Sequence, residues 1–372
     1  MARRAAVQET EAPPEADRLA PFPHPRDTRR LVGHVAAAEE LAGDHAAGRL
    51  HHGWLIGGLE GIGKATLAYH FATWLLARPD ERGASASLDV PPEAQAARQI
   101  RAQSHPGLLV VRRPFDPKAK RLASVVTVDE VRRLRSFLGH TSAGDGWRVV
   151  IVDPAEDLNP SAANALLKSL EEPPPRTVFL LLAAEPGRLL PTIRSRCRTL
   201  TLQPLSREEL WEAAGQAMTA AEVEPPLAEE RERLTMLASG SVRRFLHLAV
   251  SGGLELEAAV RRALGLLPKV DWNAVHTLAD DLSGAANEDR FEQFYELLTG
   301  LIARLVRIRG GRDGDPAERE LATRLIAEGA LATWAELWET ICHDKAEAQA
   351  LNLDRKTLVL GTFARLEAAA RR

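Results

Sequence analysis

A glycine-rich segment between residues 58 and 66 has the residue types and the spacing of a phosphate-binding loop. The pattern G-x-x-x-x-G-K-[ST] holds from Gly58 through Gly63 and Lys64. Gly58, Gly61 and Gly63 permit a tight turn whose backbone N–H groups point inward, and the following helix adds the positive end of its dipole. Lys64 supplies a point charge for the β- and γ-phosphates. We therefore predict that these residues contact a nucleotide.

The groups that hydrolysis requires are incomplete. Ala65 replaces the Ser or Thr whose hydroxyl binds Mg²⁺, and Thr66 does not substitute for it because the next helical position is rotated by about 100°. Asp153 ends an apolar run and fits the strand-end acid that helps to hold Mg²⁺, although a helix or turn cap is the alternative. The water-polarising Glu that often follows is replaced by Pro154, and Glu156 is displaced along the chain. We expect ATP or ADP binding with weakened Mg²⁺ coordination and little or no hydrolysis.

Two arginines stand in segments that can meet a nucleotide. Arg196, in Ser195-Arg196-Cys197, follows a predicted strand and a Pro-rich surface segment. From there an arginine can act as a finger on another subunit's nucleotide; the alternative is a surface ion pair. Arg243 stands where a helical domain would fold over the loop and contact the γ-phosphate; the alternative is an exposed arginine at a helix start.

Strands that alternate with helices predict a parallel α/β sheet with flanking helices through about residue 203. The predicted strands cover residues 54–57, 108–111, 148–153 and 177–182, and the helices between them include 36–47, 66–76, a short one at 93–103, and one capped by Asn159 with Pro160 at its first position. Residues 112–121 are expected to form a basic loop. Ser206 to Glu209 reads as a capping box that starts a purely helical remainder.

Four segments follow from these signals. We predict a disordered tail over residues 1–20, an α/β nucleotide-binding domain over 21–203, a small helical lid over 204–252 and an all-helical domain over 253–372.

The composition is that of an ordinary globular protein. A net charge of −3 does not force nucleic-acid binding, and the two cysteines, Cys197 and Cys342, form neither a metal pattern nor a disulfide framework. The N-terminus has no apolar segment of the signal-peptide kind, and the chain has no apolar run of membrane-spanning length. We expect a cytoplasmic protein without a membrane association.

The order of motifs resembles the bacterial clamp-loader AAA+ family. The phosphate loop, Val128 to Arg132 (VDEVR), Asn164 to Pro174 (NALLKSLEEPP) and the Ser-Arg-Cys motif together support this resemblance, and the NALLKSLEEPP stretch is highly specific. It implies a five-subunit ring that opens a sliding clamp and places it on primed DNA. It also implies that Arg196 serves a neighbouring subunit, that Val32 lines an adenine pocket, and that the C-terminal domain forms a collar.

The resemblance further implies partners: tau or gamma and delta subunits, the sliding clamp indirectly, and primer–template DNA. A catalytic loader ATPase of the tau or gamma type is the first alternative, disfavoured by Ala65 and Pro154. A small-molecule P-loop kinase is the second, disfavoured by the long helical C-terminal third. No zinc is expected, because residues 77–105 lack the four cysteines that many relatives carry there. A candidate DNA patch, for which a solvated loop is the alternative, comprises Arg112, Arg113, Lys118, Lys120 and Arg121.

Overall fold

A computed structural model describes residues 15–83, 87–117, 121–139, 146–284, 287–351 and 353–371 of the chain. The described chain divides into two compact units, Met1–Leu246 and His247–Arg372. Helix α9 (Val242–Val250) is continuous across the division. The first unit holds the sheet, and the described elements of the second unit are helices.

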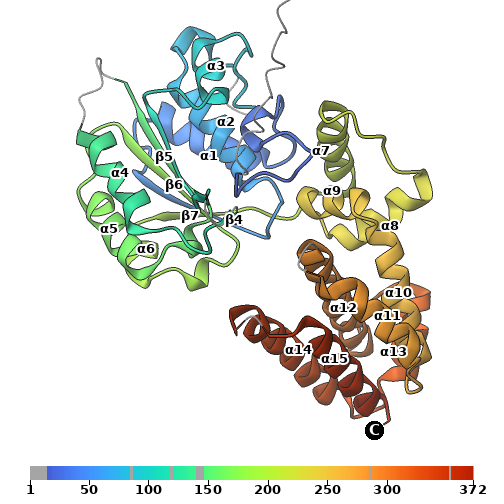
Figure 1. The fold of residues 1–372 in the computed structure, drawn as a ribbon. Helices are drawn as coiled ribbons and strands as arrows, with labels where there is room; N and C mark the ends of the chain where they lie inside the picture. Colours follow the sequence, from blue (N-terminus) through green and yellow to red (C-terminus); the bar gives the residue numbers. More distant parts are fainter. Residues whose placement is uncertain are drawn as a thin grey trace, which may run out of the picture. The chain divides into compact units, whose positions relative to one another are not determined.

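The first unit is built on a five-stranded parallel sheet, as the sequence predicted (Figure 1). The strand order is β2-β5-β6-β1-β7, and β1 pairs in parallel with both β6 and β7. Because the strands are parallel, all their carboxyl ends meet at one edge, which is where open α/β sheets bind ligands. The strands are β1 (Gly53–Gly57), β2 (Leu108–Val111), β5 (Arg148–Val152), β6 (Thr177–Ala183) and β7 (Arg198–Thr201).

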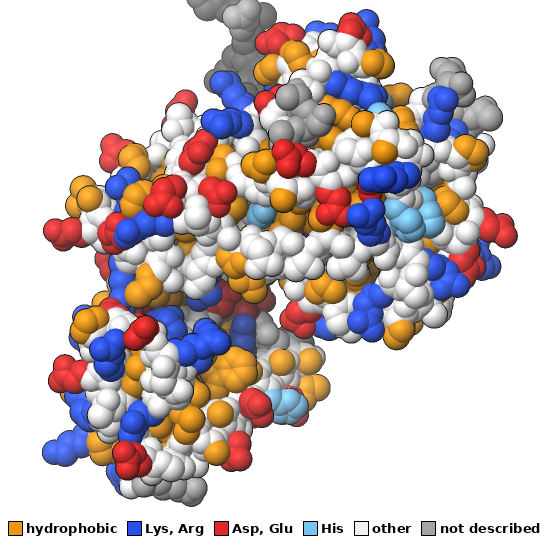
Figure 2. All heavy atoms as spheres, turned by 180° about the vertical axis from the view of Figure 1, so that it is seen from behind, with side chains coloured by type: hydrophobic (Ala, Val, Ile, Leu, Met, Phe, Trp, Pro, Cys, Tyr) orange, Lys and Arg blue, Asp and Glu red, His pale blue; other side chains and the backbone are white. Residues whose placement is uncertain are grey.

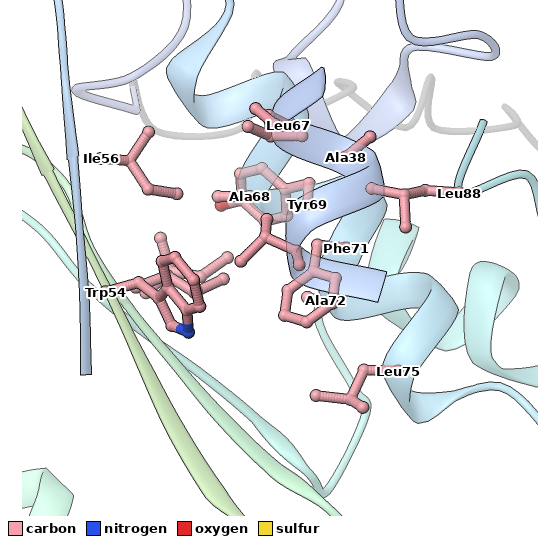
Figure 3. Close-up of a cluster of buried hydrophobic side chains, with 14 of the residues drawn as sticks. Ala38, Trp54, Ile56, Leu67, Ala68, Tyr69, Phe71, Ala72, Leu75 and Leu88 are labelled. Carbon is pink, nitrogen blue, oxygen red and sulfur yellow. The ribbon is translucent and has the colours of Figure 1, made fainter. Parts of the chain in front are cut away.

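Alternate residues of the central strands enter two separate cores, one on each face of the sheet. Trp54 and Ile56 belong to one core, whereas Leu55 between them belongs to the other. Figure 3 shows Trp54 and Ile56 beside helix α2, against Leu67 and Phe71. This division follows from the two-residue period of a strand, and burial on both faces explains why these strands read as continuous apolar runs.

Helices cover both faces of the sheet. Residues of α1, α2 and α3 line one core, and residues of α4, α5 and α6 line the other (Figure 1). The first unit also contains the short 3-10 helices η1 to η4. The bounds are α1 (Val35–Ala46), α2 (Lys64–Leu76), α3 (Gln95–Arg101), α4 (Val128–Gly139), α5 (Pro160–Glu171), α6 (Pro191–Arg194), η1 (Pro25–Asp27), η2 (Pro79–Glu81), η3 (Ala155–Asp157) and η4 (Pro186–Arg188).

Two predicted helix starts are confirmed. The Asn159 side chain accepts a hydrogen bond from the Ala162 backbone N–H, and Pro160 occupies the first turn of α5. At the start of α7 (Arg207–Ala220), Ser206 and Glu209 form a reciprocal capping box. These contacts are local, so the sequence alone was sufficient to find them.

Three features differ from the sequence prediction. Strand β7 was missed because only Leu200 among its four residues is buried, which leaves a short polar edge strand without an apolar run. The expected loop at 112–121 contains an antiparallel pair, β3 (Phe115–Asp116) and β4 (Arg121–Leu122). Of the tail expected over residues 1–20, residues 1–14 lie outside the described residues, whereas Glu15 and Asp17 form ion pairs within the first unit.

The predicted lid helices belong to the same compact unit as the sheet. Helices α7, α8 (Ala228–Ala238) and the first part of α9 follow β7, and the Leu205 backbone N–H donates to the Gly240 carbonyl oxygen. Gly240 has a φ of 82° and lies so close to Pro204 that an added Cβ would come within 2.6 Å of the proline Cβ. Glycine is therefore required at this junction.

The second unit consists of helices packed around an aromatic core. Phe291, Phe294 and Tyr295 of α12 are buried, with Trp334 of α14 and Phe363 of α15. The buried Glu318 carboxylate binds Arg261 and Arg304, which satisfies its charge inside the unit. The all-helical prediction is confirmed. The helices are α10 (Gly253–Leu266), α11 (Trp272–Ser283), α12 (Glu288–Arg309), α13 (Pro316–Leu325), α14 (Leu331–Leu351) and α15 (Arg355–Ala370).

Candidate functional site

The phosphate loop joins the carboxyl end of β1 to the start of α2, as predicted. Gly58, Gly61 and Gly63 all have positive φ angles, of 142°, 75° and 110°, in backbone regions that side chains rarely adopt. The Lys64 side chain is only 9% exposed, and its Nζ donates to the carbonyl oxygens of Gly58 and Leu59 at 2.7 Å each. Burial lowers the pKa of Lys64, while nearby carboxylates oppose that shift. The lysine thus binds its own loop.

The lid and the N-terminal segment both contact this loop. The Arg243 backbone N–H donates to the Gly61 carbonyl oxygen at 3.3 Å, and a Cβ added to Gly61 would lie 2.4 Å from the Arg243 Cβ. The His34 Nε2 lies 2.7 Å from the Ile62 carbonyl oxygen. Sequence reasoning missed the His34 contact, because nothing local pairs residue 34 with the loop. The loop is therefore packed from two sides.

Arg243 reaches the loop but its side chain points to an acid. Its Nε lies 3.4 Å from the Glu60 carboxylate, and the side chain is partly exposed. The prediction that the lid brings Arg243 close to the phosphate loop agrees with this geometry. A contact with a γ-phosphate remains a prediction.

Asp153 stands beside Lys64 at the end of β5. Asp153 keeps some solvent contact, yet burial raises its pKa to about 7, and the negative charges of Asp17 and Glu156 act in the same direction. Lys64 and Arg243 only partly oppose this shift. A carboxyl group with this pKa is partly protonated near neutral pH.

Glu156 is committed to the backbone of another loop. Its Oε1 accepts a hydrogen bond from the Ala184 N–H at 2.7 Å, immediately after β6. Its Oε2 is buried and has no partner among the described residues. The segment that follows β6, Ala184-Glu185, is thereby tied to η3. Glu156 thus holds the segment after β6 through one of its two carboxylate oxygens.

The residues around Lys64 do not fit a Mg²⁺ ion. Mg²⁺ requires near-octahedral oxygen ligands, usually carboxylates together with phosphates and waters. Ala65 packs its methyl group against the core and offers no oxygen ligand. One carboxylate oxygen of Glu156 accepts a hydrogen bond from the Ala184 backbone, and burial raises the pKa of Asp153 to about 7. A phosphate could contact the Lys64 Nζ only after the lysine breaks its hydrogen bonds to the carbonyl oxygens of Gly58 and Leu59. Among the described residues, the loop therefore combines the glycines of a phosphate cradle with an incomplete set of Mg²⁺ ligands. Nucleotide binding and the absence of hydrolysis remain predictions.

Asp153 precedes helix α5 in the chain, and Arg196 follows it. Its Nη2 lies 2.7 Å from the Glu171 Oε1, and its Nη1 donates to the Thr192 carbonyl oxygen at 2.9 Å. The side chain remains 35% exposed. The arginine thus forms the surface ion pair of the alternative interpretation, and its side chain is partly exposed. A role as a finger on another subunit's nucleotide remains a prediction.

Comparisons with known proteins give the family. Residues 33–206 match the family model described as "DNA polymerase III, delta subunit". DNA polymerase III subunit delta' of Pseudomonas aeruginosa is 35% identical over 254 residues, which are 68% of this chain and 71% of that protein. The chain belongs to the family of DNA polymerase III delta' subunits. DNA polymerase III subunit delta' of Escherichia coli K12 is 28% identical over 88% of this chain and 92% of that protein.

Membership of the delta' family confirms the predicted resemblance to the bacterial clamp-loader AAA+ family. The tau subunit of Escherichia coli K12 is also similar, at 27% identity over 82% of this chain and 48% of that protein. None of the described helices combines the length and apolarity that crossing a membrane requires.

In this delta' family member, the expected adenine-pocket residue lies in a tightly packed turn. Val32 is partly buried and precedes Gly33, whose φ is 70°. A Cβ added to Gly33 would lie 2.6 Å from the Leu205 side chain and 3.2 Å from Glu209. The turn thus connects the phosphate loop, through His34, to the start of α7. The role of Val32 toward a base remains a prediction.

Two arginines of the candidate DNA patch form ion pairs within the first unit. Arg112 pairs with Glu15 and Asp17, and Arg113 pairs with Asp157. Lys118 and Lys120 lie outside the described residues, and Arg121 is exposed. Figure 2 shows acidic and basic side chains interspersed on the face that it presents. Among the described residues of the patch, the internal ion pairs favour a structural role.

A buried ionic cluster on the N-terminal segment was not predicted. Asp17 contacts His24 at 2.8 Å and Arg112 at 2.7 Å, and the Tyr69 hydroxyl donates to it at 3.3 Å. Burial alone would raise the pKa of Asp17, but the hydrogen bond and charge of His24 and the charge of Arg112 lower it to about 2. Glu15, Asp17 and His24 are also close enough to share a cation. Arg112 and Arg26 together balance the charges of the two carboxylates, so we interpret the cluster as a structural clasp.

Proposed function

We propose that this chain acts as the delta' subunit of a DNA polymerase III clamp loader and supports ATP-dependent loading of the sliding clamp onto primed DNA. Its partners are tau or gamma and delta subunits, with the clamp and primer–template DNA engaged by the assembled ring in the bacterial cytoplasm. Family membership supports this role. The family relatives' names include tau, gamma and delta' subunits of the same polymerase.

The chain itself is proposed to be a non-hydrolysing member of that ring. Ala65, Pro154 and the backbone-bound Glu156 leave no complete set of groups for hydrolysis. Lys64 already binds two loop carbonyl oxygens, so ATP or ADP must displace those hydrogen bonds and should bind weakly. The loop then serves chiefly as the junction between β1, α2 and the start of α9.

Arg196 is proposed to act on the ATP of a neighbouring subunit. A guanidinium group near the transferred phosphoryl group stabilises the charge that develops in the transition state. The observation that carries this proposal is a chain without hydrolytic groups whose Arg196 is anchored on one side and exposed on the other. Such a residue is worth roughly 10³- to 10⁵-fold in turnover at the site it serves.

A reconstituted clamp loader tests this proposal with Arg196→Ala in this chain. We expect DNA-stimulated ATP turnover at the neighbouring site and clamp loading to fall at least about tenfold. Arg196→Lys should restore little, because lysine lacks the planar fork. Arg194→Ala, at an exposed position two residues earlier, is the matched control. Normal loading by the Arg196→Ala assembly would overturn the finger role.

A further inference from the structure

Glu171 is the last residue of α5, and its carboxylate is the nearest acidic group bound to Arg196. The Arg196 Nη2 lies 2.7 Å from the Glu171 Oε1, and the two side chains are 35% and 47% exposed. Both residues belong to motifs that the sequence singled out separately, NALLKSLEEPP and Ser-Arg-Cys. The structure brings those two motifs together through this ion pair.

The backbone that carries Arg196 is fixed independently of the ion pair. The Arg196 N–H donates to the Ile193 carbonyl oxygen at 3.1 Å, which ends the short helix α6. Gly53 at the start of β1 allows close approach, because a Cβ there would lie 3.2 Å from the Arg196 carbonyl oxygen and 3.2 Å from the Cys197 Sγ. The Cα of Arg196 is therefore held against the sheet, and only its long side chain remains to be oriented.

The two side-chain contacts orient the guanidinium group and use only two of its N–H donors. Arginine has five N–H donors in a rigid plane. One donor binds Glu171 and one binds the Thr192 carbonyl oxygen, which leaves three for another ligand. The C-terminal end of α5 also carries a partial negative charge, which favours a cation at this place.

We propose that Glu171 is a positioning residue for Arg196: it fixes the guanidinium plane so that the remaining donors meet the phosphates of a nucleotide held by a neighbouring subunit. The inference rests on the proposed finger role of Arg196. Glu171 touches neither substrate nor the reacting atoms. Because Glu171 already restricts the Arg196 side chain, less conformational entropy is lost when the ring closes on ATP.

The ion pair is exposed, so it contributes little to the stability of the fold. Its effect should therefore appear in turnover and not in the melting temperature. Because the Thr192 contact and the backbone remain in a Glu171 variant, part of the orientation is retained. We expect Glu171→Ala to lower the turnover of the neighbouring site by about three- to tenfold, far less than Arg196→Ala.

The test uses the complete reconstituted loader with Glu171→Ala, Glu171→Gln and the matched control Glu172→Gln, which changes the adjacent exposed glutamate at the C-cap of α5. Turnover and the KM for ATP are measured with primed DNA and clamp. We expect a lower maximal rate with an unchanged KM for Glu171→Ala, an intermediate rate for Glu171→Gln, whose amide oxygen still accepts a hydrogen bond, and normal behaviour for Glu172→Gln. Each variant's melting temperature should match that of the unchanged chain.

A double variant separates this inference from the proposed function. If Glu171 acts through Arg196, Glu171→Ala should cause no further loss in the Arg196→Ala background. An equal further loss there, or a faster rate in Glu171→Ala alone, overturns the positioning role and leaves the finger intact. Normal turnover in Arg196→Ala overturns the finger role and the inference with it.

Discussion

At the scale of single residues, burial and neighbouring charges set the pKa of Asp153 beside the phosphate loop. Burial raises this pKa to about 7, the charges of Asp17 and Glu156 act in the same direction, and Lys64 and Arg243 oppose them. The unfolded carboxyl has a pKa near 3.8. The folded protein therefore binds a proton here more tightly than the unfolded chain does, and the charged form destabilises the fold.

Replacing Asp153 by Asn should stabilise the free chain at alkaline pH. The penalty of the charged carboxylate is full above about pH 7, and it decreases as the pH falls from 7 toward 4 because the folded protein takes up the proton first. We expect Asp153→Asn to raise the free energy of unfolding by on the order of 2 kcal/mol at pH 8.5 and by little near pH 4. Urea unfolding at both pH values measures this.

The exposed Asp27 provides the comparison for that experiment, since an exposed substitution such as Asp27→Asn should change stability by only a small amount. Equal stability of Asp153→Asn and the unchanged chain at pH 8.5 would contradict the burial argument.

At the scale of elements, three segments distant in sequence meet the strand-end edge of the sheet: the N-terminal clasp, the phosphate loop and the start of α9. Most central strands and their helices were predictable from the sequence. A strand that is buried on both faces is a continuous apolar run, and the capping residue of a helix lies next to the helix in the sequence. The polar edge strand β7 was not predictable, because it is defined by its hydrogen-bonded pairing with β1 and not by an apolar run in the sequence. Contacts such as His34 with the loop have no local sequence signal.

The contact between the loop and α9 depends on Gly61. Its φ is 75°, and an added Cβ would lie 2.4 Å from the Arg243 Cβ and 2.5 Å from the Ser241 Oγ. We expect Gly61→Ala to lower the free energy of unfolding by about 2 kcal/mol or more, from left-handed strain together with the steric clash. Thermal and urea unfolding report the loss, and trypsin cleavage after Arg243 should become faster as the start of α9 is released.

Gly187→Ala is the matched control for this substitution, because nothing lies within 4 Å of its added Cβ. Unchanged stability of Gly61→Ala would show that the start of α9 is not packed on the loop in solution.

The N-terminal clasp should make the first unit sensitive to acid. The Asp17 side chain is 2% exposed, and its pKa is lowered to about 2 from an ordinary value of 3.8. Because the pKa of Asp17 is lower in the folded protein than in the unfolded chain, its charged carboxylate stabilises the fold above about pH 4. This stabilisation is lost as the pH falls toward 2. Asp17→Asn should therefore cost about 2 to 3 kcal/mol at pH 7, and little at pH 2.

Chemical unfolding at pH 7 of Asp17→Asn beside Glu39→Gln, an exposed change on α1, separates loss of the clasp from a general charge effect. A loss no larger than that of the α1 variant would show that the clasp does not hold the N-terminal segment.

At the scale of the whole molecule, the chain combines two units with separate cores. Both cores that flank the sheet lie within the first unit, and the aromatic core of α12, α14 and α15 lies within the second. Independent cores favour independent folding. The proposed collar role belongs to the second unit, and the proposed arginine role belongs to the first.

A chain that ends at Val250, the last residue of α9, should test this division. We expect it to unfold cooperatively in a circular dichroism melt, because both sheet cores are complete. We also expect it to lose stable assembly with partner loader subunits in size-exclusion chromatography. Co-elution with those subunits as strong as that of the full chain would contradict a collar role for the second unit.

The sequence by itself determined the family, the parallel sheet, the phosphate loop and the missing groups at Ala65 and Pro154, because each of these is written in contiguous residues. Only the tertiary structure decided what the remaining polar groups do. It tied Lys64 to its own loop, Glu156 to the Ala184 backbone, Asp17 to Arg112 and Glu171 to Arg196. These partners lie far apart in the chain, except for the lysine's, and burial and charge act on them only once folding has brought them together.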